Sequence, residues 1–191
     1  MRIGLISDTH IPSVANEPPA QVARAFEGVD LIIHAGHIFA SSCIEWLERI
    51  APVKTSESWM EGTGEALARS GRIEVLELEG HSIGLVHELI LVKLGDEVLP
   101  GSIERKFPPG ESLSKTLQNI FGKPVDTVVF GQTHEAMVEL HDGVLLVNPG
   151  SPNMVKQVQR LGTVAILEVT PESREARIID LAKMDESASM S

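Results

Sequence analysis

The sequence predicts an α/β domain whose buried parallel strands carry functional residues at their carboxyl ends. Short apolar runs that begin at Ile3, Asp30 and Asp126 each end abruptly in turn residues or glycine, as buried strands do. Segments with a helical spacing of apolar residues follow the first two runs. This strand–helix alternation predicts a right-handed parallel unit. Such sheets bind their ligands at the carboxyl ends of the strands.

The length and composition are those of one folded domain. A chain of 191 residues with 42% hydrophobic and 23% charged residues can bury a sizeable core and has an ordinary globular composition. The formal net charge of −11 argues against a nucleic-acid surface, which normally shows a basic stripe. It also disfavours anionic substrates unless a bound cation offsets the field locally.

Cysteine usage and hydropathy limit the metal chemistry and the location. Cys43 is the only cysteine, so neither an internal disulfide nor a thiolate zinc cluster can form. The chain shows no basic segment followed by an apolar stretch at its N-terminus, and no run of about 18 apolar residues. We therefore expect no signal peptide, no membrane span and a cytoplasmic location.

The first part of the chain alternates strands and helices. A loop rich in Pro and Asn follows His10, and Gly28 ends the first helix. Ser41 or Ser42 is the expected N-cap of the second helix. The predicted elements are helix Ala20–Glu27, strand Asp30–Gly36, helix Cys43–Arg49 and a weak strand at Pro52 and Val53.

The middle and the end of the chain contain predicted hairpins. We expect a loop at 56–64, a hairpin of Ile73–Leu78 with His81–Val86, and a surface excursion at 89–110 that serves as a lid or an oligomer contact. Helix Ser112–Phe121, capped by Ser112 or Ser114, precedes strand Asp126–Phe130. Further strands are predicted at Ala136–Leu140, Val144–Val147, Thr163–Val169 and Ala176–Asp180. Residues 1–182 are predicted to form a single domain, and 183–191 a disordered tail.

Residues able to bind a metal follow several of these strands. They are Asp8, His10, His37, His87 and His134. A lone histidine at a strand end is more often a hydrogen-bonded structural residue. His34 is expected to be one, and His81 and His141 are expected at the surface of hairpins. Ligand types at several strand ends of one sheet edge instead predict a metal site.

Five motifs in order resemble a known family. They are Ser7-Asp8-Thr9-His10, Leu31-Ile-Ile-His-Ala-Gly36, Gly84-Leu-Val-His87, Gly131-Gln-Thr133-His134 and Asn148-Pro149-Gly150-Ser151. Over residues 1–170 the chain resembles the calcineurin-like metallophosphoesterases, in their small bacterial and archaeal phosphodiesterase branch. The resemblance implies a four-layer α/β/β/α sandwich of two mixed sheets. It also implies two metal ions at one edge and a bridging hydroxide that attacks phosphorus.

The chain departs from the family pattern at the second metal. His37 stands where the family has a bridging aspartate, and Gln132 stands where it has a histidine. The loop Ser56–Glu61 lacks the family's metal-binding asparagine. The first-metal set therefore maps onto Asp8, His10, His37 and His134. The second maps only onto His37, His87 and Gln132, and is weak; Glu57, Glu61 and Glu88 are candidate substitutes.

The donor chemistry indicates one firm divalent metal. A neutral imidazole has one free lone pair and no charge, so it cannot bridge two cations as a carboxylate does. Three imidazoles and one carboxylate suit zinc, manganese, iron, nickel or cobalt, and glutamine is a poor ligand for such metals.

The resemblance implies a phosphoesterase of reduced activity that hydrolyses a small phosphate ester. His87 would orient phosphate or move a proton, and Asn148 would support the site. The alternative is a catalytically inactive relative that serves as a binding or assembly module. A nucleotide-binding fold is set aside because the loop after the first strand has no glycine. Homo-oligomer formation stays open.

Overall fold

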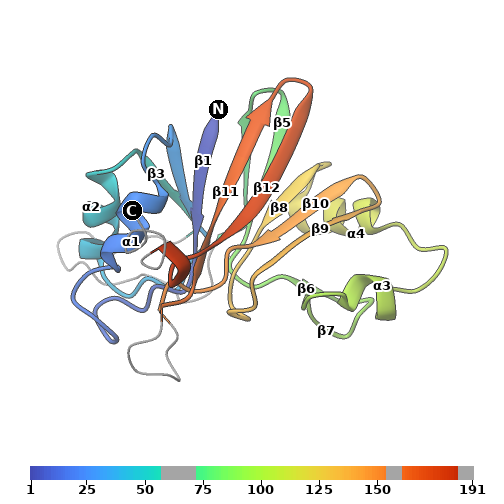
Figure 1. The fold of residues 1–191 in the computed structure, drawn as a ribbon. Helices are drawn as coiled ribbons and strands as arrows, with labels where there is room; N and C mark the ends of the chain where they lie inside the picture. The colour runs from blue at the N-terminus through green and yellow to red at the C-terminus, as the bar shows by residue number, and fades with distance from the viewer. Residues whose placement is uncertain (57–71, 154–160, 185–191) are drawn as a thin grey trace.

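The computed structural model describes residues 1–56, 72–153 and 161–184. Two five-stranded sheets pack face to face, and helices cover both outer faces (Figure 1). The predicted four-layer α/β/β/α sandwich is therefore confirmed. Of the predicted loop at 56–64, residues 57–64 lie outside the described residues.

The first sheet has the strand order β12-β11-β1-β2-β3. Strands β1, β2 and β3 run parallel, and β11 joins β1 in an antiparallel pair. Short helices α1 and α2 provide the crossovers that parallel strands require. The bounds are β1 Arg2–Ile6, α1 Ala20–Ala25, β2 Leu31–His34, α2 Ser41–Glu48, β3 Val53–Thr55, β11 Thr163–Thr170 and β12 Ser173–Asp180.

The second sheet has the order β4-β5-β8-β10-β9. Its three central strands, β5, β8 and β10, are parallel, and hairpin partners close both edges. The bounds are β4 Glu74–Leu78, β5 His81–Leu85, α4 Leu113–Phe121, β8 Thr127–Val129, β9 Met137–His141 and β10 Val144–Asn148. The parallel strands of both sheets end at one edge of the sandwich, and this edge carries the candidate ligands.

The predicted surface excursion at 89–110 is only partly a surface feature. It contains β6 Ile90–Leu91, β7 Asp96–Glu97 and α3 Ser102–Lys106. Leu91 and Val98 are buried in the same apolar cluster as α4, because alternate side chains of this segment face the second sheet. Ile90 and Val92 on its other face are exposed. Its role as a lid or an oligomer contact stays a prediction.

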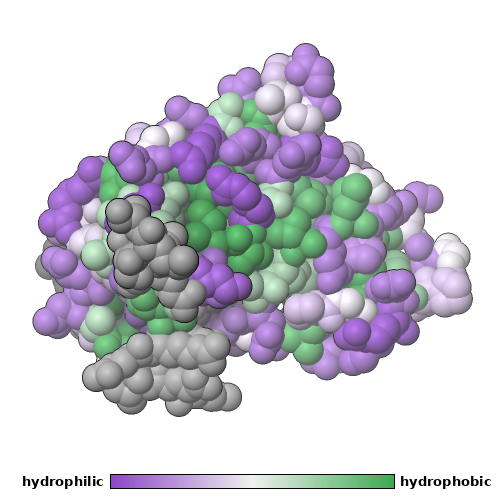
Figure 2. Space-filling view, viewed as in Figure 1, coloured by the Kyte–Doolittle hydropathy of each residue, from purple (hydrophilic) through white to green (hydrophobic). Residues whose placement is uncertain are grey.

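Among the described residues, three apolar clusters fill the three spaces between the four layers. One lies between α1, α2 and the first sheet, one between α4 and the second sheet, and one between the two sheets. The last cluster opens to solvent where the edge strands β9 and β12 face each other. Apolar side chains reach the surface there (Figure 2). No helix among the described residues combines the length and apolar character needed to cross a membrane.

One local expectation was wrong. Helix α2 begins at Ser41 after Ala40 and has no side-chain cap bond, so neither Ser41 nor Ser42 is its N-cap. Serine 41 instead donates its hydroxyl to Glu45 one turn later. Within the predicted tail 183–191, Met184 packs against the first apolar cluster, and the boundary of the tail stays a prediction. The rest of the predicted tail, 185–191, lies outside the described residues.

Candidate metal centre

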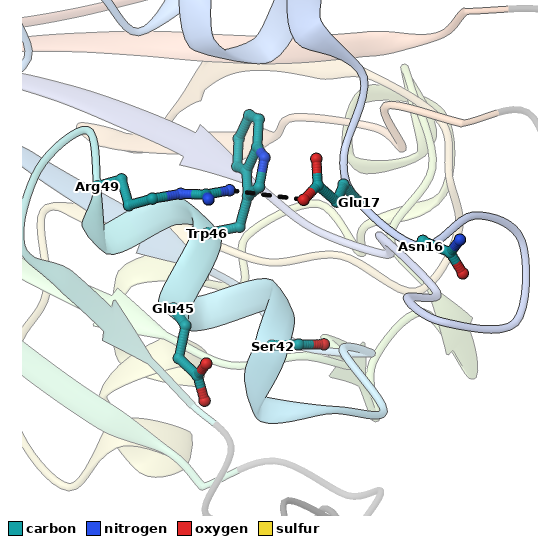
Figure 3. A pocket seen from close by; sticks show the side chains of 6 residues that line it. All are labelled: Asn16, Glu17, Ser42, Glu45, Trp46 and Arg49. Atoms are coloured by element: carbon teal, nitrogen blue, oxygen red, sulfur yellow. Dashed lines mark ion pairs between the residues drawn. The ribbon is translucent and has the colours of Figure 1, made fainter.

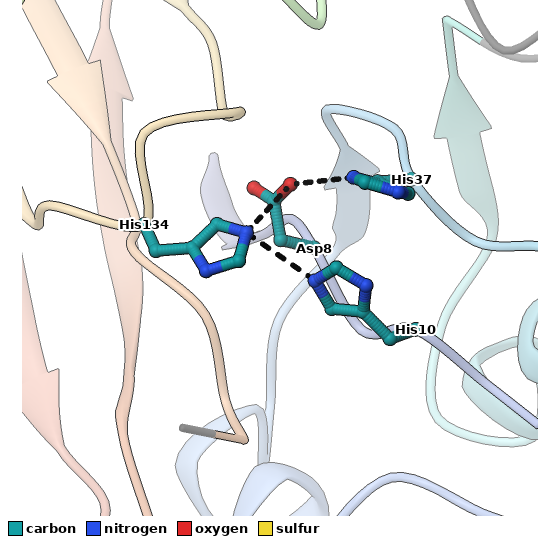
Figure 4. A group of neighbouring side chains, drawn as sticks. All are labelled: Asp8, His10, His37 and His134. Carbon is teal, nitrogen blue, oxygen red and sulfur yellow. Dashed lines mark hydrogen bonds and ion pairs between the residues drawn. The ribbon is translucent and has the colours of Figure 1, made fainter. Parts of the chain in front are cut away.

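Four side chains from three loops converge at the carboxyl edge. Asp8 and His10 follow β1, His37 follows β2, and His134 follows β8. One ligand atom from each lies within 4.8 Å of the others (Figure 4). The sequence predicted this set, and the structure brings all four together.

Three of the separations between these ligand atoms are those of neighbouring donors on one metal ion, and all four atoms lie within 4.8 Å of one another. Nε2 of His10 lies 3.3 Å from Nε2 of His134. Oδ1 of Asp8 lies 3.3 Å from Nδ1 of His37 and 3.5 Å from Nε2 of His134. Metal–ligand bonds of about 2.0–2.1 Å at tetrahedral angles place neighbouring donors about 3.3–3.5 Å apart. The residues present therefore fit a single ion held by three imidazoles and one carboxylate.

The backbone around the centre adopts an uncommon conformation. Asp8, His10, His37, Gln132 and His134 all have φ between 51° and 68°, in the left-handed region. This region is costly for residues with a side chain, and such strain clusters at functional sites. It turns consecutive side chains toward one point, which an extended strand end cannot do.

Gly131 and Gly36 allow the loops to approach one another. A Cβ on Gly131 would lie 2.7 Å from Oδ2 of Asp8. The next residue, Gln132, donates its backbone N–H to that same oxygen at 3.0 Å. A Cβ on Gly36 would lie 2.9 Å from the ring of His87. Both positions therefore need glycine for steric reasons.

The electrostatics keep the donors in their binding forms. Burial opposes ionisation of Asp8, but hydrogen bonds from His134 and His37 outweigh it and lower the pKa of this carboxyl well below its usual range. Burial, with the nearby charges of His37 and His134, lowers the pKa of His10 to about 4. Asp8 is thus a carboxylate and His10 a neutral imidazole at neutral pH, as metal binding requires.

His87 lies beside the four-residue group. Its Nδ1 is 2.9 Å from the carbonyl oxygen of Ala35, so Nδ1 carries a proton that it donates there. Its Nε2 points to the centre and lies 3.8 Å from Oδ1 of Asp8. The ring is buried, so its orientation is fixed by packing as well as by the hydrogen bond.

The Asn148–Ser151 turn after β10 supports the centre from behind. The Asn148 amide donates to the carbonyl of Gly131 and to Thr133 Oγ1, each at 3.0 Å. Ser151 donates its hydroxyl to the backbone oxygen of Asp8 at 2.8 Å, and Ser7 donates to Gly150. Ser7 and Ser151 belong to the sequence motifs, but their bonds to Gly150 and Asp8 span 143 residues each and have no local signal.

The residues mapped to a second metal are arranged differently. His37 already faces Asp8 in the four-residue group. Gln132 contributes its backbone N–H to Asp8. Glu88 is exposed and is not a member of the group. Glu57 and Glu61 lie outside the described residues.

The remaining histidines divide into three cases. His34 is a buried structural residue, as predicted; burial lowers its pKa to about 3. His81 is buried, so the expectation of a surface position was wrong. Its ring joins Asp126 at 2.7 Å to the carbonyl of Thr170 at 3.0 Å and thereby links the two sheets. His141 is partly exposed and pairs with Glu139 in the hairpin.

A separate hollow of about 330 Å³ lies beside α2 (Figure 3). Arg49 lies over the Trp46 ring, 5.7 Å from its centroid, and pairs with Glu17. The hollow is lined by Asn16, Glu17, Ser42, Glu45, Trp46 and Arg49. None of these belongs to the four-residue group, so the candidate metal chemistry lies elsewhere.

Two curated relatives match nearly the whole of this chain. A probable metallophosphoesterase of Methanothermobacter thermautotrophicus is 31% identical over 180 residues, which cover 94% of this chain and 92% of the relative. A second, from Methanocaldococcus jannaschii, is 32% identical over 184 residues, which cover 95% of this chain and 82% of the relative.

A solved structure and a family model agree with the architecture. Wild-type Vps29 complexed with Zn²⁺ from Entamoeba histolytica matches with a TM-score of 0.62 at 18% identity, over 95% of this chain and 99% of that one. Residues 1–172 match the model described as the calcineurin-like phosphoesterase superfamily domain. This chain therefore belongs to the calcineurin-like phosphoesterase superfamily.

Proposed function

We propose that this protein is a metal-dependent phosphoesterase that hydrolyses phosphodiesters at a centre with one firm metal ion. The observation that carries the proposal is the convergence of three imidazoles and one carboxylate whose ligand atoms all lie within 4.8 Å of one another. The family of the chain supports the reaction class. A bound divalent ion supplies a Lewis acid and lowers the pKa of water.

Asp8, His10, His37 and His134 are the proposed ligands. The donor set suits a transition metal such as zinc, manganese, iron, nickel or cobalt better than magnesium or calcium. The bound cation also offsets the net charge of −11, which otherwise repels a phosphate ester. A second ion is proposed to bind weakly, because His37 replaces a bridging carboxylate and Gln132 replaces an imidazole.

His87 is the proposed residue for orienting phosphate and moving a proton. Its Nδ1–H is committed to Ala35, so Nε2 is the nitrogen that faces the substrate. When Nε2 takes up a proton, the imidazolium can donate a charge-assisted hydrogen bond to a phosphate oxygen. Asn148 is proposed to act through the loop of Gly131 and Thr133 that it holds, since its amide bonds go to that loop.

Metal content and turnover test the proposal together. We expect one ion per chain in the wild type and slow hydrolysis of bis(p-nitrophenyl) phosphate. Aryl esters should react faster than alkyl phosphodiesters, because their leaving groups need no proton. His10→Ala should lower metal affinity at least tenfold. His87→Ala should keep the metal and lose about 10²-fold or more in rate.

His141→Ala is the matched control, since it removes a histidine from the β9–β10 hairpin; it should keep both metal and rate. Equal metal loss in His10→Ala and His87→Ala would contradict the proposed ligand set. A wild type that binds one ion but hydrolyses neither class of ester would favour the alternative, a binding or assembly module without catalysis.

A further inference from the structure

We propose that Thr9 and His34 are positioning residues that set the orientation of His87 through the peptide bond between Ala35 and Gly36. The inference rests on the proposed function, because His87 matters only if it serves the centre. Neither Thr9 nor His34 belongs to the group of candidate ligands.

The peptide between Ala35 and Gly36 lies between two histidine rings. Its carbonyl oxygen accepts a hydrogen bond from Nδ1 of His87 at 2.9 Å. Its N–H donates to Nδ1 of His34 at 3.1 Å. The plane of this peptide thus couples the two rings, since rotating it would break both bonds.

The proton positions on His34 follow from its partners. A backbone N–H can only donate, so Nδ1 of His34 is the acceptor and the proton of the neutral ring is on Nε2. Nε2 lies 3.1 Å from Thr9 Oγ1, which therefore accepts that proton's hydrogen bond. All three hydrogen bonds therefore run in one direction. His87 donates to the peptide, the peptide donates to His34, and His34 donates to Thr9.

Burial makes this network demanding. Thr9 and His34 have no exposed surface, and His87 is 4% exposed. A buried donor without a partner is unfavourable, so each ring has one favoured tautomer and orientation. Without the Thr9 hydroxyl, Nε2–H of His34 would lose its acceptor. If the His34 proton then moved to Nδ1, this nitrogen could no longer accept the hydrogen bond from the Gly36 N–H.

The loop after β1 and the loop after β2 would remain hydrogen-bonded to each other without this side-chain network. Two backbone bonds, from Asp8 to Gly36 and from His10 to His37, also join them. These two bonds hold the loops after β1 and β2 together, but neither of them involves the Gly36 N–H. The side-chain network therefore sets the peptide plane, and the backbone bonds set the loop spacing.

The test is ¹⁵N NMR of the imidazole rings in the metal-free full-length protein at about pH 8, where histidines are mostly neutral. The wild type should show His87 as the Nδ1–H tautomer and His34 as the Nε2–H tautomer. Thr9→Val has the same shape without the hydroxyl, and it should shift His87 to a mixture of tautomers. Thr9→Ser should restore the wild-type signals.

Thr127→Val is the matched control. Thr127 is also fully buried, but it lies at the start of β8, at the opposite edge, where its hydroxyl contacts Asp126. It should leave the tautomers of His34 and His87 unchanged. His34→Asn keeps an acceptor near the Nδ1 position and should retain the His87 tautomer, whereas His34→Leu should not. The Thr9 pair suffices if the His34 variants do not fold.

Hydrolysis gives a second readout. Thr9→Val should lower the rate constant about tenfold at unchanged metal content, as the loss of an outer-shell partner does. A wild-type His87 tautomer in Thr9→Val would overturn the inference. A wild type without metal or turnover would instead overturn the proposed function, and the tautomer measurement would still decide the inference.

Discussion

At the residue scale, burial decides which histidines can serve a metal and which serve the fold. His34 and His10 are both shifted toward the neutral form, to pKa values of about 3 and about 4. His10 presents Nε2 to the centre beside His134, whereas both nitrogens of His34 are used by Gly36 and Thr9. A neutral imidazole is therefore a candidate metal ligand at His10 and a structural hydrogen-bonding group at His34.

The low pKa of His34 predicts an acid-sensitive fold. Below a pH of about 6.5 the unfolded chain binds a proton on this ring that the folded protein excludes, so stability falls as pH falls toward the folded pKa of about 3. Between about pH 7 and pH 5 this one group should remove about 2 kcal/mol from the free energy of unfolding. Urea denaturation at different pH values, with metal removed by a chelator, measures this loss of stability.

His34→Leu should make that pH dependence shallower by about the same amount, whatever its effect on stability at pH 7. His141→Ala, in the partly exposed hairpin, should leave the slope nearly unchanged. An identical slope in His34→Leu and the wild type would contradict the assignment.

At the element scale, each half of the sandwich packs an aromatic ring onto a glycine of a parallel strand. A Cβ on Gly4 of β1 would lie 2.9 Å from the ring of Phe26, just after α1. A Cβ on Gly84 of β5 would lie 2.8 Å from the ring of Phe121 in α4. The missing side chains let the helices lie close to the sheets, which keeps the four layers compact.

Gly84→Ala should therefore destabilise the protein by about 1–3 kcal/mol through overpacking. Phe121→Leu makes room, so the double variant should be more stable than the sum of the single effects predicts. The coupling free energy from urea denaturation should be about 1 kcal/mol. The pair Gly84→Ala with Phe26→Leu lies in separate layers and should show coupling near zero; equal coupling in both cycles would refute the packing argument.

At the scale of the whole molecule, the candidate centre joins the two sheets. Asp8, His10 and His37 follow strands of the first sheet, whereas His134 follows a strand of the second. The same two sheets meet at the opposite edge through His81. A bound ion would add a further link between the two sheets at this edge, beside the hydrogen bonds from Ser151 and Gln132 to Asp8.

Metal should therefore stabilise the folded protein strongly. At a free concentration of about 100 times the dissociation constant, a ligand specific to the folded state adds about 2.7 kcal/mol. For a chain of this size that corresponds to a rise of about 5–10 °C in melting temperature. Calorimetry with zinc or cobalt should show this rise in the wild type and in His141→Ala, and little of it in His10→Ala. The same rise in His10→Ala would place the ion elsewhere.

The sequence by itself determined the strand ends at which the candidate ligands lie, and its five motifs implied the four layers through the family that they resemble. Apolar runs of strand length ended at Asp8, His37, His87 and His134, and parallel strands bring their carboxyl ends to one edge for reasons of chain direction alone. Only the tertiary structure decided that the ligand atoms of Asp8, His10, His37 and His134 lie within 4.8 Å of one another, because this depends on left-handed backbone at each loop. It also decided that His81 is buried, that Ala40 precedes α2 without a serine cap, and that His34 braces Gly36 and Thr9. These features depend on contacts between residues far apart in the chain. The local pattern of polar and apolar residues does not predict such contacts.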